Sequence, residues 1–132
     1  MEITGKNFIG NKLSGLGKVN YKTIDPLKNI ENEILFVEAT SEELEESVAL
    51  ADRAFPIYRE LSGAQRASFL NAIADEILNL GDALIDMYCR ETGLPQGRAI
   101  GERGRTIFQL QLFAKTIQTE DWRKDINEAA IP

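Results

Sequence analysis

The sequence predicts a mainly α-helical chain, with about four helices preceded by a small antiparallel β element. Two observations predict this class. After residue 40, apolar residues recur at helical spacing in four stretches, each bounded by residues typical of helix ends. Before residue 40, the apolar runs are short, rich in β-forming residues and separated by turn-prone pairs. We therefore divide the 132 residues into a β segment over 1–40 and a helical segment over 41–132.

The β segment holds three candidate strand regions. Residues 8–13 place the turn-prone pair Gly10-Asn11 between apolar residues, which predicts a turn between short strands. Residues 21–24 form a second candidate strand, which an Asp-Pro pair ends. Residues 34–38 (ILFVE) are the richest in β-forming side chains and give the strongest strand prediction.

The first helix is predicted to begin after Thr40. Thr40 and Glu43 have the spacing of a capping box, in which each side chain bonds the other residue's backbone N–H. The apolar residues that follow step by 4, 3, 4 and 3 positions, so they share one side of the helix. They are Leu44, Val48, Ala51, Phe55 and Tyr58. We expect Pro56 to end or kink this helix.

The second and third helices are predicted between residues 62 and 93. Ser62 and Gln65 form a second capping-box pair. The expected inward face of the second helix is Leu70, Ile73, Ile77 and Leu80. Gly81 suits the end of that helix, because glycine adopts the left-handed conformation without a Cβ penalty. Asp82 is then placed to cap the third helix, which we expect to end at Gly93.

The fourth helix is predicted to start at Pro95, a residue suited to a first helical turn, and to run to about Thr119. Its expected inward residues are Ile100, Ile107, Leu110, Ala114 and Ile117. The tail beyond it begins polar and turns apolar near its end.

Three glycines share one face of the fourth helix. Gly97, Gly101 and Gly104 are spaced by 4 and 3, and each costs about 1 kcal/mol relative to alanine inside a helix. Such a stripe indicates that something passes close to the backbone. Close packing against another helix is one explanation, and space for a ligand beside Arg105 is the other.

The composition excludes several kinds of reactive site. The sequence contains no histidine and one cysteine, Cys89. Catalytic Ser-His-Asp and Cys-His sets, histidine metal ligands and an internal disulfide are therefore excluded. Cys89 continues an apolar helix face through Ile85, so we expect a core thiol. Neighbouring acids are expected on solvated helix faces: Asp75/Glu76, Asp82/Asp86 and Glu120/Asp121.

The charge distribution argues against two classes of partner. The net charge is −6, and residues 31–60 hold nine acids against two arginines. Nucleic-acid-binding proteins usually carry a basic patch, and no long one is present in the sequence. No apolar run approaches the ~20 residues that a membrane span needs. We expect no nucleic-acid or membrane partner, no metal, and a reducing, cytoplasmic location.

Three segments carry a resemblance to a known family. Residues 51–78 read ADRAFPIYRELSGAQRASFLNAIADEIL, residues 91–95 read ETGLP, and residues 101–114 run from GERGRT to LFA. With these segments the chain resembles the N-terminal region of the NAD(P)-dependent aldehyde dehydrogenases. It is most similar to their alpha-ketoglutaric semialdehyde (2,5-dioxovalerate) dehydrogenase subgroup.

The resemblance implies an enzyme with a Rossmann-like α/β parent fold. Such an enzyme oxidises an aldehyde, here a semialdehyde acid, to the carboxylate with NAD or NADP. A cysteine thiolate attacks the aldehyde carbon, hydride passes to the cofactor, and a glutamate-activated water releases the acid. In the family those groups lie downstream of the matched region. We expect this chain to be an inactive N-terminal part, with residues 41–132 belonging to the truncated nucleotide-binding domain and with no catalytic, cofactor-binding or metal-binding residue.

The resemblance also implies a substrate site on the fourth helix. It places Gly101 and Arg105 at positions that face the substrate tunnel. Arg105 would hold the distal carboxylate of a semialdehyde acid, since guanidinium groups bind carboxylates bidentately, and Gly101 would leave room. The alternative is that Arg105 pairs only with an acid of a neighbouring helix.

The expected partners are the remainder of the chain's own enzyme and further copies of it. Apolar helix faces need cover, because large exposed apolar patches are rare in monomers. The rival interpretation is a self-contained helical interaction domain that binds a protein through the face over residues 97–104.

Overall fold

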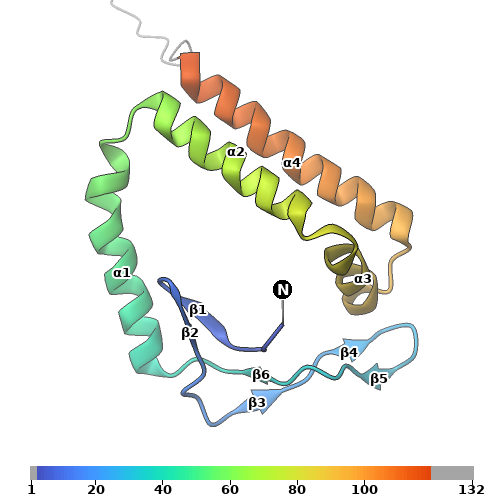
Figure 1. Cartoon of the computed structure of the whole chain (residues 1–132). Coiled ribbons are helices and arrows are strands. Elements are labelled where there is room, and N and C mark those ends of the chain that lie inside the picture. The colour runs from blue at the N-terminus through green and yellow to red at the C-terminus, as the bar shows by residue number, and fades with distance from the viewer. Residues whose placement is uncertain (1–2, 120–132) are drawn as a thin grey trace, which may run out of the picture. The chain divides into compact units, whose positions relative to one another are not determined.

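The computed structural model describes residues 3–119 and contains four helices in that range (Figure 1). They are α1 (Ser41–Arg59), α2 (Gly63–Asn79), α3 (Gly81–Thr92) and α4 (Gln96–Thr119). Short antiparallel strand pairs precede the helices. The predicted class, mainly α behind a small antiparallel β element, is confirmed. No helix in the described range is both long and apolar enough to cross a bilayer.

The chain divides into two compact units. The first unit comprises residues 1–60 and 80–100, which contain the described strands, α1, α3 and the start of α4. The described part of the second unit comprises residues 61–79 and 101–119 and contains α2 and the rest of α4. The tail from residue 120 onward lies outside the described residues.

Within residues 3–119 the strands form three separate antiparallel pairs. They are β1 (Asn7–Ile9) with β2 (Lys12–Ser14), β3 (Asn20–Tyr21) with β6 (Phe36–Val37), and β4 (Ile24–Asp25) with β5 (Ile30–Glu31). The predicted turn at Gly10-Asn11 is confirmed, and it joins β1 to β2 as a hairpin. The predicted strand over 21–24 is wrong as a single strand, because its two ends pair with different partners. The change occurs beside Thr23, whose carbonyl accepts the Asn32 N–H at 2.8 Å.

The capping box at the start of α1 is confirmed. The Glu43 N–H donates to Thr40 Oγ1 at 3.2 Å, and Glu43 Oε2 accepts the Thr40 N–H at 2.8 Å. Glu43 is also buried. Its second carboxylate oxygen, Oε1, accepts the hydroxyl of Ser14 and the N–H of Leu16. One carboxylate therefore caps the helix and also holds the end of the β1–β2 hairpin.

Pro56 was expected either to end or to kink α1, and the first of these alternatives is wrong. The helix continues through Pro56 to Arg59. Pro56 lies in the last turn, where its missing N–H costs a single intrahelical hydrogen bond. The predicted apolar stripe of Leu44, Val48, Ala51, Phe55 and Tyr58 is present on the helix but exposed. We call these five residues the α1 stripe.

The helix ends around α3 confirm the glycine predictions and correct one cap. Gly81 and Gly93 both take positive φ angles, 56° and 70°, as expected of glycine near a helix end. Asp82 does not cap α3, because the helix already begins at Gly81 and Asp82 lies in its first turn. The preceding residue, Leu80, has helical dihedrals, so no extended capping position remains between α2 and α3.

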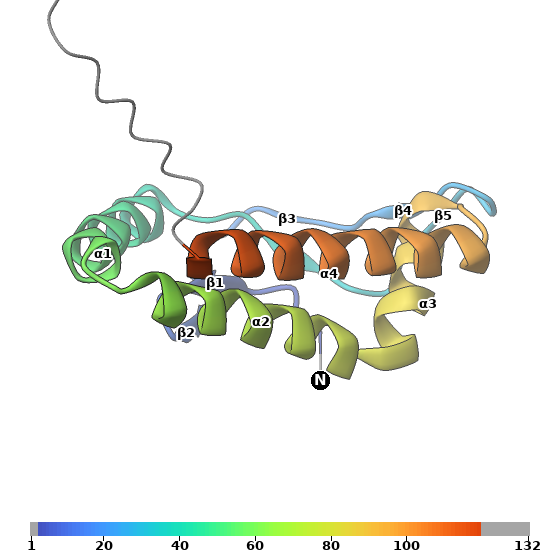
Figure 2. The ribbon, with the colours of Figure 1, turned by 90° about the horizontal axis from the view of Figure 1, so that it is seen from above.

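In the second unit, α2 and α4 lie side by side (Figures 1 and 2). The start of α2 meets the end of α4, where a Cβ on Gly63 would lie 2.3 Å from the Ile117 carbonyl oxygen. The buried hydrophobic residues of this unit are Ala67, Ala74, Ile107 and Ala114. Small residues on α2 thus permit a close approach.

Two predicted helix faces need correction. The expected inward residues of α2, Leu70, Ile73 and Ile77, are only half-buried, because the alanines take the most buried places; Leu80, also expected there, is half-buried and lies just beyond the end of α2. On α4, Ile107 and Ala114 are buried as predicted, but Ile100 is exposed and Ala99 is buried instead. Large side chains at the closest positions would hold the backbones apart, which explains the preference for alanine.

We predict that Gly63→Ala destabilises the protein by about 1–3 kcal/mol, because the new methyl group meets a backbone carbonyl that cannot move freely. Gly104→Ala is the matched control, since no atom lies within 4 Å of the Cβ position there. The control is expected to stabilise the protein by up to about 1 kcal/mol through helix propensity. Urea denaturation of both variants measures this, and equal effects would refute the close approach.

We further predict a pH-dependent contribution from Glu43. Hydrogen bonds from the Ser14 hydroxyl and the Thr40 amide hold the pKa of this carboxyl below its ordinary value of 4.5. A lowered folded-state pKa stabilises the fold above pH 4.5, and this stability is lost as the pH falls through the folded-state pKa. Glu43→Gln should lower the Tm at neutral pH and reduce the loss of Tm on acidification. An unchanged slope of Tm against pH would contradict the prediction.

Candidate functional site

The ETGLP segment ends α3 and fixes it to the strands of the first unit. Glu91 Oε1 accepts the Thr23 hydroxyl at 2.8 Å and the Asn32 side-chain amide at 3.2 Å. The same amide donates to Thr23 Oγ1 at 3.0 Å, and Asn32 is buried. Glu91 therefore joins the end of α3 to the segment that contains β4 and β5.

The next two residues of the segment shape the turn after α3. Thr92 Oγ1 donates to the Tyr88 carbonyl at 2.7 Å and accepts the Leu94 N–H at 3.2 Å. Gly93 is left-handed, and its N–H donates to the Cys89 carbonyl at 2.9 Å. A Cβ at Gly93 would also lie 3.0 Å from the ring of Pro26. Both the backbone conformation and the space require glycine here.

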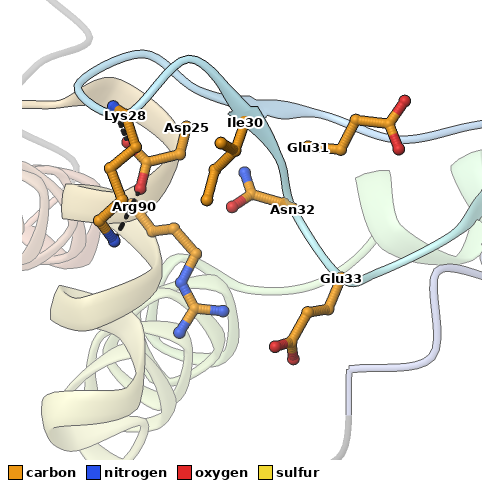
Figure 3. Close-up of a pocket in the computed structure, with 7 residues that line it drawn as sticks. All are labelled: Asp25, Lys28, Ile30, Glu31, Asn32, Glu33 and Arg90. Atoms are coloured by element: carbon orange, nitrogen blue, oxygen red, sulfur yellow. Dashed lines mark hydrogen bonds and ion pairs between the residues drawn. The ribbon is translucent and has the colours of Figure 1, made fainter.

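A depression of about 230 Å³ lies beside this turn. Its lining residues are Asp25, Lys28, Ile30, Glu31, Asn32, Glu33 and Arg90. Figure 3 shows that Arg90 comes from α3 and that the other lining residues come from the chain around β4 and β5. Three carboxylates against two cations leave no excess positive charge for an anionic ligand.

Most of these charges are already engaged. Asp25 pairs with Lys28 at 3.2 Å and accepts the Leu27 N–H at 3.0 Å, while Glu31 pairs with Lys22 at 3.5 Å. Burial by itself raises the pKa of Asp25, but the hydrogen bonds from Lys28 and Leu27 outweigh it, so the pKa lies below the ordinary value. Charged residues that line the depression are thus used in ion pairs around the turn between β4 and β5.

The two residues predicted for the substrate site lie one turn apart on α4. Gly101 and Arg105 are both exposed. Helical geometry puts them on the side of α4 away from the buried Ile107 and Ala114. Among residues 3–119, Arg105 makes no ion pair or hydrogen bond with an acid.

The glycine stripe of α4 faces open space in the described structure. No atom lies within 4 Å of a Cβ position at Gly97, Gly101 or Gly104. The expectation that close helix packing explains these glycines is therefore wrong for the described residues. The close helix approach of the second unit occurs at Gly63 instead. The exposed apolar residues Phe108 and Leu112 continue the same side of α4.

The remaining candidate groups add no reactive centre. Cys89 is half-buried on α3 rather than fully buried. Within the described range, no group of three or more metal-binding side chains is present. The predicted surface acids are exposed where described, namely Asp75, Glu76, Asp82 and Asp86; Glu120 and Asp121 lie outside the described residues.

The sequence reasoning missed the two long-range carboxylate contacts. Glu43 was predicted only as a capping residue, and Glu91 only as part of a motif. Neither residue stands out in the sequence, because Glu43 lies in the acidic run 42–46 and Glu91 follows the charged Arg90. Their partners, Ser14 at 29 positions and Thr23 at 68 positions, have no local pattern that connects them.

Comparison with known proteins decides the family. The aldehyde dehydrogenase family profile matches residues 13–130, which is most of the chain. The chain belongs to the aldehyde dehydrogenase family. This confirms the resemblance carried by the ETGLP and GERGRT segments and disfavours the rival interpretation as a self-contained interaction domain.

Two curated aldehyde dehydrogenases illustrate the similarity. The chain is 43% identical over 119 residues to alpha-ketoglutaric semialdehyde dehydrogenase 2 of Azospirillum brasilense, covering 89% of this chain and 23% of that protein. It is 34% identical over 131 residues to the alpha-ketoglutaric semialdehyde dehydrogenase of Acinetobacter baylyi, covering 99% of this chain and 25% of that protein. The chain thus spans about a quarter of the length of these relatives.

We predict that Glu91→Ala lowers the free energy of unfolding by about 1–3 kcal/mol, because it leaves the Thr23 and Asn32 donors without their acceptor. Glu33→Ala, at the exposed edge of the same depression, is the control and should change stability by less than about 0.5 kcal/mol. Chemical denaturation measures both. Equal losses would show that Glu91 contributes no specific contact.

Proposed function

We propose that this chain contributes to an enzyme that oxidises a semialdehyde acid, with alpha-ketoglutaric semialdehyde as the first candidate. The observation that carries the proposal is the 43% identity over 119 residues to a relative named for that substrate. The second relative, at 34% identity, is named for the same substrate. In this proposal residues 41–132 form part of the nucleotide-binding domain of the enzyme.

The reaction converts an aldehyde, water and NAD(P)+ into a carboxylate, NAD(P)H and protons. The hydride leaves the aldehyde carbon, and water supplies the second carboxylate oxygen. The described residues do not fit the cofactor, because no glycine-rich turn there follows a strand and opens a helix. We assign no catalytic or cofactor-binding role to this chain.

The proposed role of the chain in recognition rests on α4. Arg105 presents an exposed guanidinium group, and Gly101 one turn earlier leaves the adjoining surface without a side chain. A guanidinium group binds a carboxylate through two parallel hydrogen bonds. Arg105 would thus select an aldehyde with a carboxylate at its far end.

The proposal also covers the oligomeric state and the location of the enzyme. The described helices expose large apolar residues, which need cover. In this proposal the remainder of the same enzyme chain covers part of them, and the enzyme works as a homo-oligomer. Its location is cytoplasmic, in agreement with a sequence that contains a single cysteine.

A chimera tests the proposal. The matched quarter of the Azospirillum relative is replaced by this chain, and NAD(P)H formation is followed by absorbance with alpha-ketoglutaric semialdehyde. We expect an active chimera. An inactive chimera that is folded and binds the cofactor would contradict the assignment of this chain to that enzyme.

In the active chimera, Arg105→Ala is expected to raise KM for the carboxylated aldehyde by about 10- to 100-fold, since a charged hydrogen-bonded contact is lost. The KM for an uncharged aldehyde of equal length should stay unchanged. Lys115→Ala, further along α4, is the control and should alter neither KM. An unchanged KM for the carboxylated substrate in the Arg105 variant would overturn the role of Arg105.

A further inference from the structure

Arg66 on α2 contains a buried polar atom without a partner. The side chain as a whole is half-buried, and its Nε is shielded from solvent. Within residues 3–119 no group accepts a hydrogen bond from this Nε, and no acid pairs with the guanidinium group. Nearly all buried polar groups in folded proteins are hydrogen-bonded, so this atom requires an explanation.

The start of α2 does not need the Arg66 side chain. The capping box of Ser62 and Gln65 closes this helix end without it. Arg66 takes part only through its backbone, whose N–H donates to the Ser62 carbonyl at 3.0 Å. A cation in the first turn also opposes the helix dipole. Local helix stability therefore does not explain an arginine at this position.

No acid lies near Arg66 along either helix of the second unit. Residues 61–74 and 103–119 contain no Asp or Glu. Their charged residues are all cations: Arg66, Arg103, Arg105 and Lys115. The next acid on α2, Asp75, lies nine residues further on, about 13 Å along the helix axis and on its opposite side. This part of the unit is therefore positively charged in a chain whose net charge is −6.

Arg66 continues a partly covered apolar face of α2. It precedes Leu70, Ile73 and Ile77 by 4, 7 and 11 positions, so the four side chains share one face. All four are half-buried, whereas Ala67 and Ala74 beside them are buried. A segment that packs on this face would meet three apolar residues and, at one end, a guanidinium group that lacks an acceptor.

We propose that Arg66 binds a carboxylate that is supplied by the part of the enzyme chain outside these 132 residues. The proposal rests on the proposed function, because it assigns the acceptor to that enzyme. The chain spans about a quarter of its two relatives, so the larger part of such an enzyme is available to supply the acceptor.

A carboxylate fits Arg66 better than the other acceptors in a protein. It accepts two parallel hydrogen bonds from a guanidinium group, one of them from the Nε that lacks a partner here. The terminal nitrogens of Arg66 reach the surface and can donate the second bond. A backbone carbonyl would satisfy one N–H but would leave the positive charge of this region without a counterion.

The sign of the effect of Arg66→Met tests the proposal. Methionine keeps an unbranched apolar side chain but has neither donor nor charge. In the 132-residue chain by itself, the variant should unfold at an equal or higher urea concentration, since a buried donor without an acceptor is removed. In the chimera described above, hydrogen exchange of the α2 amides should become about 10- to 100-fold faster, since a charged hydrogen-bonded contact is lost.

Arg53→Met is the matched control, because Arg53 is exposed on α1. It should leave hydrogen exchange of α2 in the chimera unchanged. Two more variants of the chimera test the charge of the acceptor. Arg66→Lys keeps the charge, whereas Arg66→Gln keeps only a neutral donor, so α2 should exchange more slowly in the Lys variant than in the Gln variant. This comparison also decides if the Met variant of the chimera does not fold.

Three results would overturn the proposal. The first is an equal loss of stability from Arg66→Met in the 132-residue chain by itself, because Arg66 would then act within this chain. The second is unchanged exchange of α2 in the Arg66→Met chimera. The third is a Gln variant as protected as the parent chimera. A folded chimera that is inactive but in which Arg66 protects α2 would contradict the proposed function and still support the carboxylate contact.

Discussion

The carboxylate of Glu43 is the group on which the first unit depends, because it closes a helix end and a hairpin end together. One oxygen accepts the Thr40 N–H within the capping box, and the other accepts donors from Ser14 and Leu16. A buried carboxylate without such donors would be expensive. With them it is stable as a charged group, and it fixes where α1 begins relative to β2.

A second carboxylate repeats this arrangement at the other end of the same unit. Glu91 lies in the last turn of α3 and accepts hydrogen bonds from Thr23 and Asn32, while a Cβ at the left-handed Gly93 would lie 3.0 Å from the Pro26 ring. The strands of this unit are only two or three residues long, and isolated two-stranded pairs are marginal in water. Polar ties to helix ends therefore hold these strands, rather than a large apolar core. The second unit is different, since it depends on alanine and glycine at a close helix approach.

The family assignment is consistent with a chain whose family motif makes structural contacts and whose helices expose surfaces. The ETGLP segment is part of the most specific resemblance to the aldehyde dehydrogenases, and its residues act here as structural ties. One side of α4 carries the exposed Gly101 and Arg105, and a Cβ at Gly101 would meet no atom within 4 Å. The α1 stripe, by contrast, is apolar and exposed in the described part of the chain. The described residues thus supply framework and surfaces, and the proposed chemistry is assigned to other parts of the enzyme.

Local sequence patterns are sufficient to predict the helices, the glycines near helix ends and the turn at Gly10-Asn11, because these features depend on residues a few positions apart. The same holds for both capping boxes; in the second, Gln65 Oε1 accepts the Ser62 N–H at 2.9 Å and the Gln65 N–H donates to Ser62 Oγ at 3.2 Å. The pattern did not predict that Ala67 and Ala74 are buried while Ile73 and Ile77 are half-buried, or that the glycines of α4 face open space. It also did not predict the donors that Glu43 and Glu91 accept. Burial and long-range hydrogen bonds depend on which backbones approach closely, and the periodicity of one helix does not identify its neighbour.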